Sequence, residues 1–208
     1  MTLERRRLAM FPLSTMVFPG AVLPLHIFEP RYQALMADCL ADDGRFGVVL
    51  ITRGREVGGG DVRAEVGTQV AITNAAPLDD GRWYLLAQGE RRVRIEQWLE
   101  DAPYPQAMVT NWPDTTETVA PALLQDATHV VRRTRALLSE TRDAPALPPD
   151  VTFDDDPTLA CWQLCAQAPL STYDAQRLLA AEGTVRRLQL LAEVTSELED
   201  DLHRLLAQ

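Results

Sequence analysis

Few side chains in this sequence are suited to catalysis. Beside the carboxylates, the common nucleophiles and bases are three histidines (His26, His129 and His203), four serines and three cysteines. No GxSxG or HExxH pattern surrounds any of them. Histidines on amphipathic helical patterns, as at His129 and His203, are usually surface or packing residues. The remaining catalytic candidate is His26, with Glu29 or Asp38 as a nearby acid, and it predicts at most a small hydrolase or a ligand-binding enzyme.

All basic residues are arginine, because the 20 positions counted as Lys or Arg contain no lysine. This excludes a phosphate-loop lysine, a Schiff-base lysine and a Ser-Lys dyad within these 208 residues. With 30 acidic residues the formal net charge is −10, which opposes binding to a phosphate backbone. We therefore expect no nucleic-acid partner.

One arginine cluster keeps RNA binding open as an alternative. Arg91, Arg92 and Arg94 are close in sequence to Trp83 and Tyr84, and arginine beside aromatic rings can stack bases. Arg92 and Arg94 share one face of a strand, whereas Arg91 is on the other, and several acids lie nearby. A solvated strand face is the simpler interpretation.

The cysteines and acidic runs do not form a metal-binding pattern. Cys161 and Cys165 are four residues apart, on one helical face, with no further cysteine or histidine nearby, so we expect them in a core. The adjacent carboxylates Asp154 to Asp156 lack the spacing of a dedicated calcium loop. We expect neither a metal nor a cofactor.

The first half of the chain has the pattern of short strands separated by turn residues, which is typical of a barrel or a sandwich. One helix, Arg31 to Ala41, interrupts them, with Pro30 at its entry and Gly44 after its end. The expected strands are Leu8–Leu13, Ala21–Phe28, Arg45–Ile51, Gly67–Asn74, Arg82–Ala87, Arg92–Leu99 and Gln106–Trp112.

The second half has helical periodicity, which predicts a boundary near residue 117 and two subdomains, 1–117 and 118–208. Asp156 before Pro157, and Ser171 three residues before Asp174, are helix-start signals. Leucines 188, 191, 198, 202 and 205 form a stripe that predicts packing against the other helices. The expected helices are Val119–Thr141, Pro157–Ala168, Thr172–Ala181 and Val185–Ala207.

No apolar run approaches the roughly 20 residues of a membrane span. The apolar stretch after Arg5 to Arg7 is short and contains Pro12 and Pro19, unlike a cleaved signal peptide. The odd number of cysteines also disfavours a secreted, disulfide-bonded chain. We expect a cytoplasmic protein with no membrane partner.

A series of motifs resembles the N-terminal, substrate-binding domain of the Lon protease family. It begins with Phe11-Pro12-Leu13, Val17-Phe18-Pro19-Gly20 and Leu23 to Tyr32. It continues in order with Phe46 to Val49, Val66-Gly67-Thr68, Asp80-Gly81-Arg82, Gly89 to Ile95 and Pro103-Tyr104. Later segments, from Leu159 through Pro169-Leu170 to Arg187-Leu188, resemble the helical half of the same region. The resemblance covers nearly the whole chain.

This resemblance implies an α+β fold, with a PUA-like β-barrel that carries one inserted helix and a following helical bundle. It also implies a non-catalytic module that binds unfolded polypeptide or a protein partner and presents damaged proteins to a separate protease. The oligomeric state stays open. We expect the binding surface in a groove between barrel and helices, formed by Phe18, Pro19, His26, Phe28, Glu29, Arg31 and Tyr32. Core packing of most of these residues is the alternative.

Overall fold

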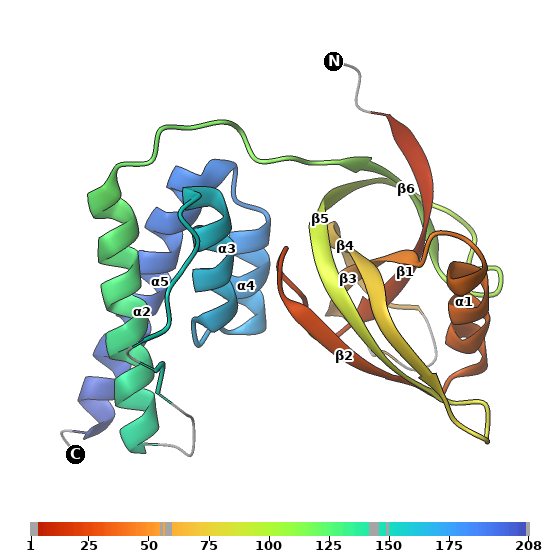
Figure 1. The fold of residues 1–208 in the computed structure, drawn as a ribbon, viewed down its shortest axis with the longest axis horizontal. Helices are drawn as coiled ribbons and strands as arrows, with labels where there is room; N and C mark the ends of the chain where they lie inside the picture. The colour runs from red at the N-terminus through yellow and green to blue at the C-terminus, as the bar shows by residue number, and fades with distance from the viewer. Residues whose placement is uncertain (1–3, 55, 57–59, 142–145, 149, 207–208) are drawn as a thin grey trace. The chain divides into compact units, whose positions relative to one another are not determined.

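The computed structural model of the chain describes residues 4–54, 56, 60–141, 146–148 and 150–206. It divides into two compact units, Met1–Pro113 and Asp114–Gln208. The strands and helix α1 belong to the first unit, and helices α2 to α5 belong to the second (Figure 1). The fold of the described residues is therefore mixed α+β, as predicted, with a six-stranded sheet and five helices.

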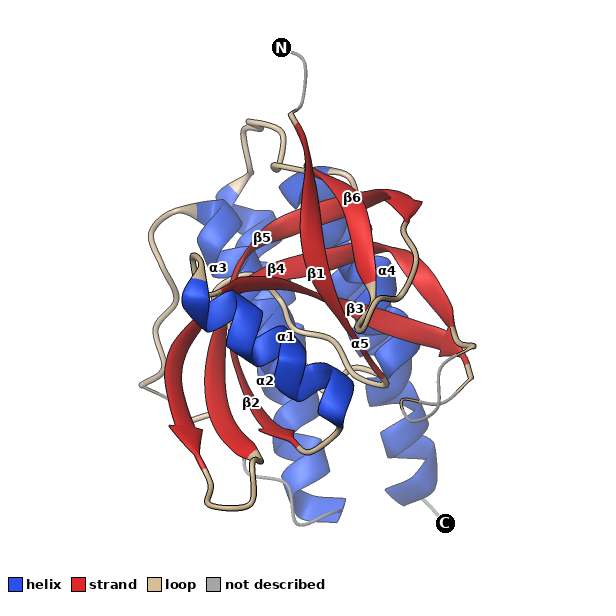
Figure 2. Ribbon diagram, turned by 90° about the vertical axis from the view of Figure 1, so that its right-hand side faces the viewer, coloured by secondary structure: helices blue, strands red, loops and turns tan. Residues whose placement is uncertain are grey.

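The six strands of the first unit form one sheet in the order β2-β5-β4-β3-β1-β6. Strands β1 and β3 are parallel, and the other pairs are antiparallel. An additional pairing of β5 with β6 closes five of the strands on themselves, while β2 stays outside at an edge (Figure 2). The strands are β1 (Arg5–Leu13), β2 (Val22–Ile27), β3 (Arg45–Arg53), β4 (Val62–Pro77), β5 (Trp83–Trp98) and β6 (Gln106–Asn111).

The sequence-based division of β5 into two strands is wrong. Gly89 and the polar residues after it have the composition of a turn, yet pairing with β4 continues on both sides of them. Gly89 stays in the strand because the backbone of residues 18–21 lies against it. Its N–H donates to the carbonyl of Ala21 at 2.9 Å, and a side chain at this position would overlap the carbonyl oxygen of Phe18.

Helix α1 (Pro30–Ala41) closes the core of the first unit with one apolar stripe, and its bounds agree with the prediction to within one residue. Tyr32, Leu35, Met36 and Cys39 of this helix are all buried with inward residues of the strands. Apart from these four, the buried residues of this cluster are Phe11, Leu13, Val17, Leu23, Ile27, Phe46, Val48, Val70, Leu85, Ala87 and Tyr104.

The second unit consists of four helices, whose starts agree with the predicted caps. The side chain of Asp156 accepts hydrogen bonds from the backbone N–H groups of Thr158 and Leu159, and Ser171 accepts one from Asp174. Helix α5 contacts α2, α3 and α4. The helices are α2 (Pro121–Thr141), α3 (Pro157–Gln167), α4 (Thr172–Leu179) and α5 (Gly183–Leu206).

The leucine stripe of α5 is buried for most of its length. Leu188, Leu191 and Leu202 are buried, which confirms the predicted packing, whereas Leu205 near the end of the helix is 62% exposed. Cys161 and Cys165 of α3 are also buried, as their spacing predicted. None of the described helices has the length and apolar content of a membrane span.

Candidate functional site

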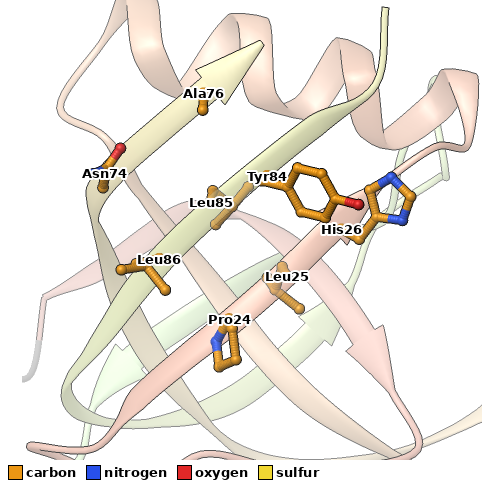
Figure 3. Close-up of a pocket in the computed structure, with 8 residues that line it drawn as sticks. All are labelled: Pro24, Leu25, His26, Asn74, Ala76, Tyr84, Leu85 and Leu86. Carbon is orange, nitrogen blue, oxygen red and sulfur yellow. The ribbon is translucent and has the colours of Figure 1, made fainter. Parts of the chain in front are cut away.

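The outer face of strands β2, β5 and β4 carries a set of uncharged side chains in two rows. One row runs from His26 through Tyr84 to Ala76. The next row runs from Pro24 through Leu86 to Asn74 (Figure 3). Since successive side chains of a strand point to opposite faces, these six residues share the face that points away from the core. We call this set the outer face.

The outer face is hollowed. A pocket of about 410 Å³ is lined by the six outer-face residues together with Leu25 and Leu85. The rings of His26 and Tyr84 stack with centroids 4.5 Å apart and planes inclined by 18° (Figure 3). This close approach fits a directly opposed pair in an antiparallel ladder. The result is a concave surface with mainly apolar walls and few hydrogen-bonding groups, which are His26, Asn74 and the Tyr84 hydroxyl.

Large apolar side chains near this pocket are exposed to solvent. Tyr84 is 54% exposed and Leu86 42%, while Phe28 and Val22, just beyond the two rows, are 53% and 59% exposed. The ring of Phe28 is 6.0 Å from that of His26. Scattered exposed apolar residues need no explanation, but a contiguous exposed patch around a pocket is characteristic of a binding surface.

The residues expected to bind from sequence are split between this surface and the core. His26 and Phe28 are exposed beside the pocket, and Pro19 is half-buried. Phe18 is 6% and Tyr32 4% exposed. Tyr32 stacks on Phe11 with ring centroids 4.1 Å apart, and its burial raises the pKa of its hydroxyl to about 12. Phe18 and Tyr32 therefore support the fold and offer almost no area to a ligand.

Glu29 and Arg31 clamp the junction between β2 and α1. Their side chains form an ion pair at 3.1 Å, and both are largely buried. Arg31 also donates to the backbone carbonyl of Glu56 at 2.7 Å and lies over the Tyr32 ring at 4.5 Å. The charged groups of Glu29 and Arg31 are thus engaged by other atoms of the protein, and the pair positions the start of α1.

The acids near His26 in sequence have other partners in the fold. Asp38 accepts a hydrogen bond from the Tyr104 hydroxyl at 2.7 Å, and Glu29 pairs with Arg31. Among the described residues that line the pocket with His26, none carries a carboxylate, a thiol or an aliphatic hydroxyl. The geometry therefore offers His26 no acid or nucleophile for hydrolysis. The described residues also include no group of three His, Cys, Asp or Glu side chains arranged for a metal ion.

The arginine cluster of β5 is organised around Trp112. The guanidinium carbon of Arg92 lies 4.3 Å from the centroid of the Trp112 ring, and that of Arg94 lies 4.2 Å from it. Only 3% of Arg92 is exposed, whereas Arg91 is an exposed residue. The indole of Trp112 thus contacts two of the three guanidinium groups that the RNA alternative would assign to bases.

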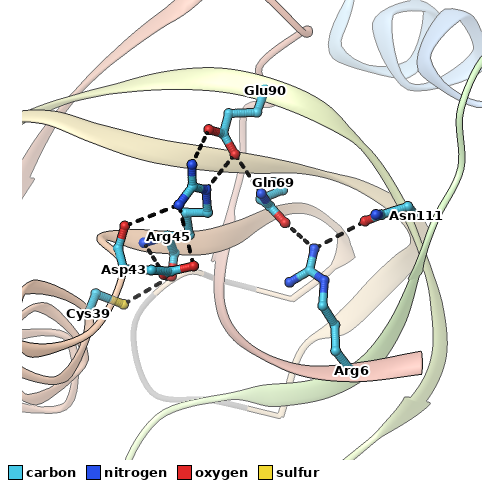
Figure 4. A network of polar contacts seen from close by, with 7 residues as sticks. All are labelled: Arg6, Cys39, Asp43, Arg45, Gln69, Glu90 and Asn111. Carbon is cyan, nitrogen blue, oxygen red and sulfur yellow. Dashed lines mark hydrogen bonds and ion pairs between the residues drawn. The ribbon is translucent and has the colours of Figure 1, made fainter. Parts of the chain in front are cut away.

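A second set of charges crosses the sheet as a polar network. Glu90 accepts two hydrogen bonds from Arg45, at 2.9 and 3.0 Å, and a third from Gln69 at 2.5 Å (Figure 4). Arg6 in turn donates to Gln69 and to Asn111. The bonds from Arg45 lower the pKa of the Glu90 carboxyl most strongly. These partners are mutually satisfied and join strands β1, β3, β4, β5 and β6.

Sequence reasoning missed Leu86 and Pro24 as surface residues and considered Tyr84 only for the RNA alternative. Their common signal is the alternation of β2 and of the start of β5, where every second residue shares a face. Leu85 and Leu86 are equally apolar, however, so alternation separates two faces without showing which one is covered. Only the fold distinguishes them, because Leu85 is buried in the same core cluster as α1.

Comparison with known proteins relates the chain to Lon proteases. The family model for the ATP-dependent protease La (LON) substrate-binding domain matches residues 7–197. Lon protease 2 of Myxococcus xanthus is 34% identical over 112 residues, which is 52% of this chain and 13% of that protein. Lon protease 2 of Herpetosiphon aurantiacus is 28% identical over 188 residues, 89% of this chain and 23% of that protein. The chain thus spans less than a quarter of the length of these two proteases.

Solved structures agree with this relation. The crystal structure of a Lon N-terminal domain protein from Xanthomonas campestris is 29% identical, with a TM-score of 0.68, over 89% of this chain and 96% of that one. The N-terminal domain of a Mycobacterium avium complex Lon protease has the same fold at 18% identity and a TM-score of 0.63, over 92% and 98% of the two chains. The family match extends over most of the sequence and across both units, so this chain belongs to the LON substrate-binding domain family.

Proposed function

We propose that this domain binds apolar segments of unfolded polypeptides on the outer face and presents them to a separate protease. The single observation that carries the proposal is the exposed, uncharged pocket formed by β2, β5 and β4, in a chain of the LON substrate-binding family. In a folded protein apolar side chains are mostly buried, so such a surface distinguishes unfolded segments from folded ones.

The chemistry of the pocket supports an aromatic or aliphatic side chain as the occupant. Its volume of about 410 Å³ is within the range of sites that hold small organic groups. Tyr84 and His26 present ring faces and edges, and Leu86 and Pro24 present aliphatic area. The amide of Asn74 and the Tyr84 hydroxyl supply hydrogen bonds to the backbone of a bound segment. We infer in addition that the closed part of the sheet is of the PUA-like kind and that α2 to α5 form the bundle that completes such domains.

A matched pair of leucine substitutions tests this proposal. Leu86 and Leu40 are each 42% exposed and both belong to the first unit, but only Leu86 lines the pocket. We expect Leu86→Ala to weaken binding of a fluorescently labelled, reduced and carboxymethylated polypeptide by roughly three- to thirtyfold, as for a central interface residue. Leu40→Ala retains wild-type affinity.

The measurement is a fluorescence anisotropy titration, after circular dichroism has shown that both variants fold. Equal affinities of the two variants would show that the polypeptide does not bind on the outer face. Absence of saturable binding by the folded wild-type chain would overturn the proposed function itself.

A further inference from the structure

We propose that the occupant of the outer face is an extended polypeptide segment that adds to the free edge of β2 as a further strand. This inference rests on the proposed function and specifies the conformation and the residue pattern of the bound segment. Strand addition differs from pocket binding alone because main-chain hydrogen bonds supply part of the affinity, whatever the side chains are.

Strand β2 is suited to this role by its position. It is the first strand in the sheet order, and over its full length from Val22 to Ile27 it pairs with β5 on one side. In the described residues no strand pairs with its other side. Strand edges of this kind offer backbone N–H and C=O groups to another chain.

The register shows which residues of β2 face the free edge. Gly89 of β5 donates to the carbonyl of Ala21, so the alternate residues that follow, Leu23, Leu25 and Ile27, direct their backbone groups to β5. The intervening residues, Val22, Pro24 and His26, direct their backbone groups to the free edge. Pro24 fits this assignment because proline has no N–H to give to β5. The edge thus offers the carbonyls of all three residues and the N–H groups of Val22 and His26.

The free edge and the pocket belong to the same residues. Pro24 and His26 direct their backbones to the edge and their side chains to the outer face, where they line the pocket. A strand added beside them would place every second side chain on the outer face, within reach of Tyr84 and Leu86 for a long or aromatic residue. One segment can therefore satisfy the edge and fill the pocket together.

The absence of charged residues in this region indicates which kind of segment it would bind. The sequence of β2, VLPLHI, contains no Asp, Glu, Arg or Lys, although such residues commonly protect exposed edges. The lining of the pocket is also free of formal charge in a chain of net charge −10. The matching partner is an uncharged segment of about six residues, the length of β2, with large apolar side chains at alternate positions. Pro24 removes one edge donor, which disfavours continuous pairing between two long strands.

Backbone methylation of a peptide tests strand addition directly. The probe is an acetylated and amidated hexapeptide of alternating threonine and phenylalanine, compared with two versions N-methylated at either the threonines or the phenylalanines. Only one alternate set of N–H groups can face β2. We expect one methylated version to lose about tenfold or more in affinity and the other to stay within about twofold of the parent peptide. Equal effects of the two methylation patterns would overturn the inference.

A variant of the protein and a hydrogen-exchange measurement test the same edge by changing or observing β2 instead of the peptide. Val22→Pro removes an edge N–H without removing a bond to β5, and Val22→Ala is its control because it loses the side chain and keeps the N–H. We expect the proline variant to bind the hexapeptide about threefold more weakly than the alanine variant or worse. In the wild-type chain, saturation with the hexapeptide slows exchange of the Val22 and His26 amides, and unchanged exchange would contradict strand addition.

The outcomes separate this inference from the proposed function. If Leu86→Ala weakens binding of the unfolded polypeptide but the hexapeptide fails to bind, or both methylated versions behave alike, strand addition is wrong and outer-face binding stands. If neither the polypeptide nor the hexapeptide binds, both proposals fail. If sedimentation shows a dimer of the chain alone in which the Val22 and His26 amides are already protected, the occupant is a second copy and the inference is overturned.

Discussion

At the scale of single residues, the chain uses its arginines for internal contacts as well as for solvation. Arg187 on α5 is the clearest case, because its side chain is fully buried. It pairs with Asp114, donates to the carbonyls of Leu178 and Ala181, and lies 3.5 Å from the centroid of the Trp162 ring. A planar guanidinium can make these contacts simultaneously, which a lysine could not.

We predict that Arg187→Met destabilises the protein by about 3–5 kcal/mol, because it removes the buried guanidinium that pairs with the carboxylate of Asp114. The control is Arg186→Met, which changes the exposed neighbour in the same helix and should alter stability by less than about 0.5 kcal/mol. Urea unfolding followed by circular dichroism measures both. Similar stabilities of the two variants would show that the buried pair contributes no more than a surface arginine.

At the scale of elements, the polar network of Figure 4 joins strands that are distant in sequence. Arg45 begins β3, Gln69 is in the middle of β4, and Glu90 follows the glycine that lets β5 pass the segment at Phe18. In the sequence, each of these polar residues alone has the appearance of a solvated surface position. Their contacts depend on the strand order, so they stabilise the sheet only when its register is correct.

The lowered pKa of Glu90 gives the sheet a defined sensitivity to acid. The carboxyl has an ordinary pKa of 4.5 in the unfolded chain and a lower one when folded, where Arg45 donates to it. Its stabilising contribution is thus complete above about pH 4.5 and is lost as the pH falls through the folded pKa. We predict that Glu90→Gln lowers the urea midpoint at pH 7 and that the difference from wild type shrinks toward pH 3.

The control for this prediction is Glu65→Gln, at an exposed position of the neighbouring strand β4. Urea midpoints measured between about pH 3 and pH 7 should follow the wild-type profile closely for this variant. A difference between Glu90→Gln and wild type that stays constant over the whole range would rule out the Glu90 carboxylate as its source.

The positions of the helices and strands were easier to predict from the sequence than which of their side chains are exposed. All five helices were placed by apolar spacing and by local signals such as Asp156 before Pro157, which act within one or two turns. The continuity of β5 could not be predicted in this way, because Gly89 stays extended only through contact with a segment about 70 residues earlier in the chain. The same limit applies to the site. Phe18 and Tyr32 have the composition of a binding motif, and only the closed sheet shows that they point inward while His26 points out.

At the scale of the whole molecule, the domain combines a closed set of strands with one exposed, uncharged face. The two Lon proteases are each about four times as long as this chain, so the chain corresponds to one part of those proteins. The network of charges and the buried arginines stabilise the module, and the outer face is left without charge. This separation supports the proposal that β2, β5 and β4 form the recognition surface.

The most direct test of that assignment is chemical-shift mapping on the full chain. Backbone amide signals are recorded while the reduced and carboxymethylated polypeptide is added. We predict that the largest shifts fall on His26, Tyr84, Leu86 and Asn74, and that the signals around Arg92 and Arg94 stay in place. Shifts that instead concentrate in helices α2 to α5 while those four residues remain unchanged would contradict the central claim.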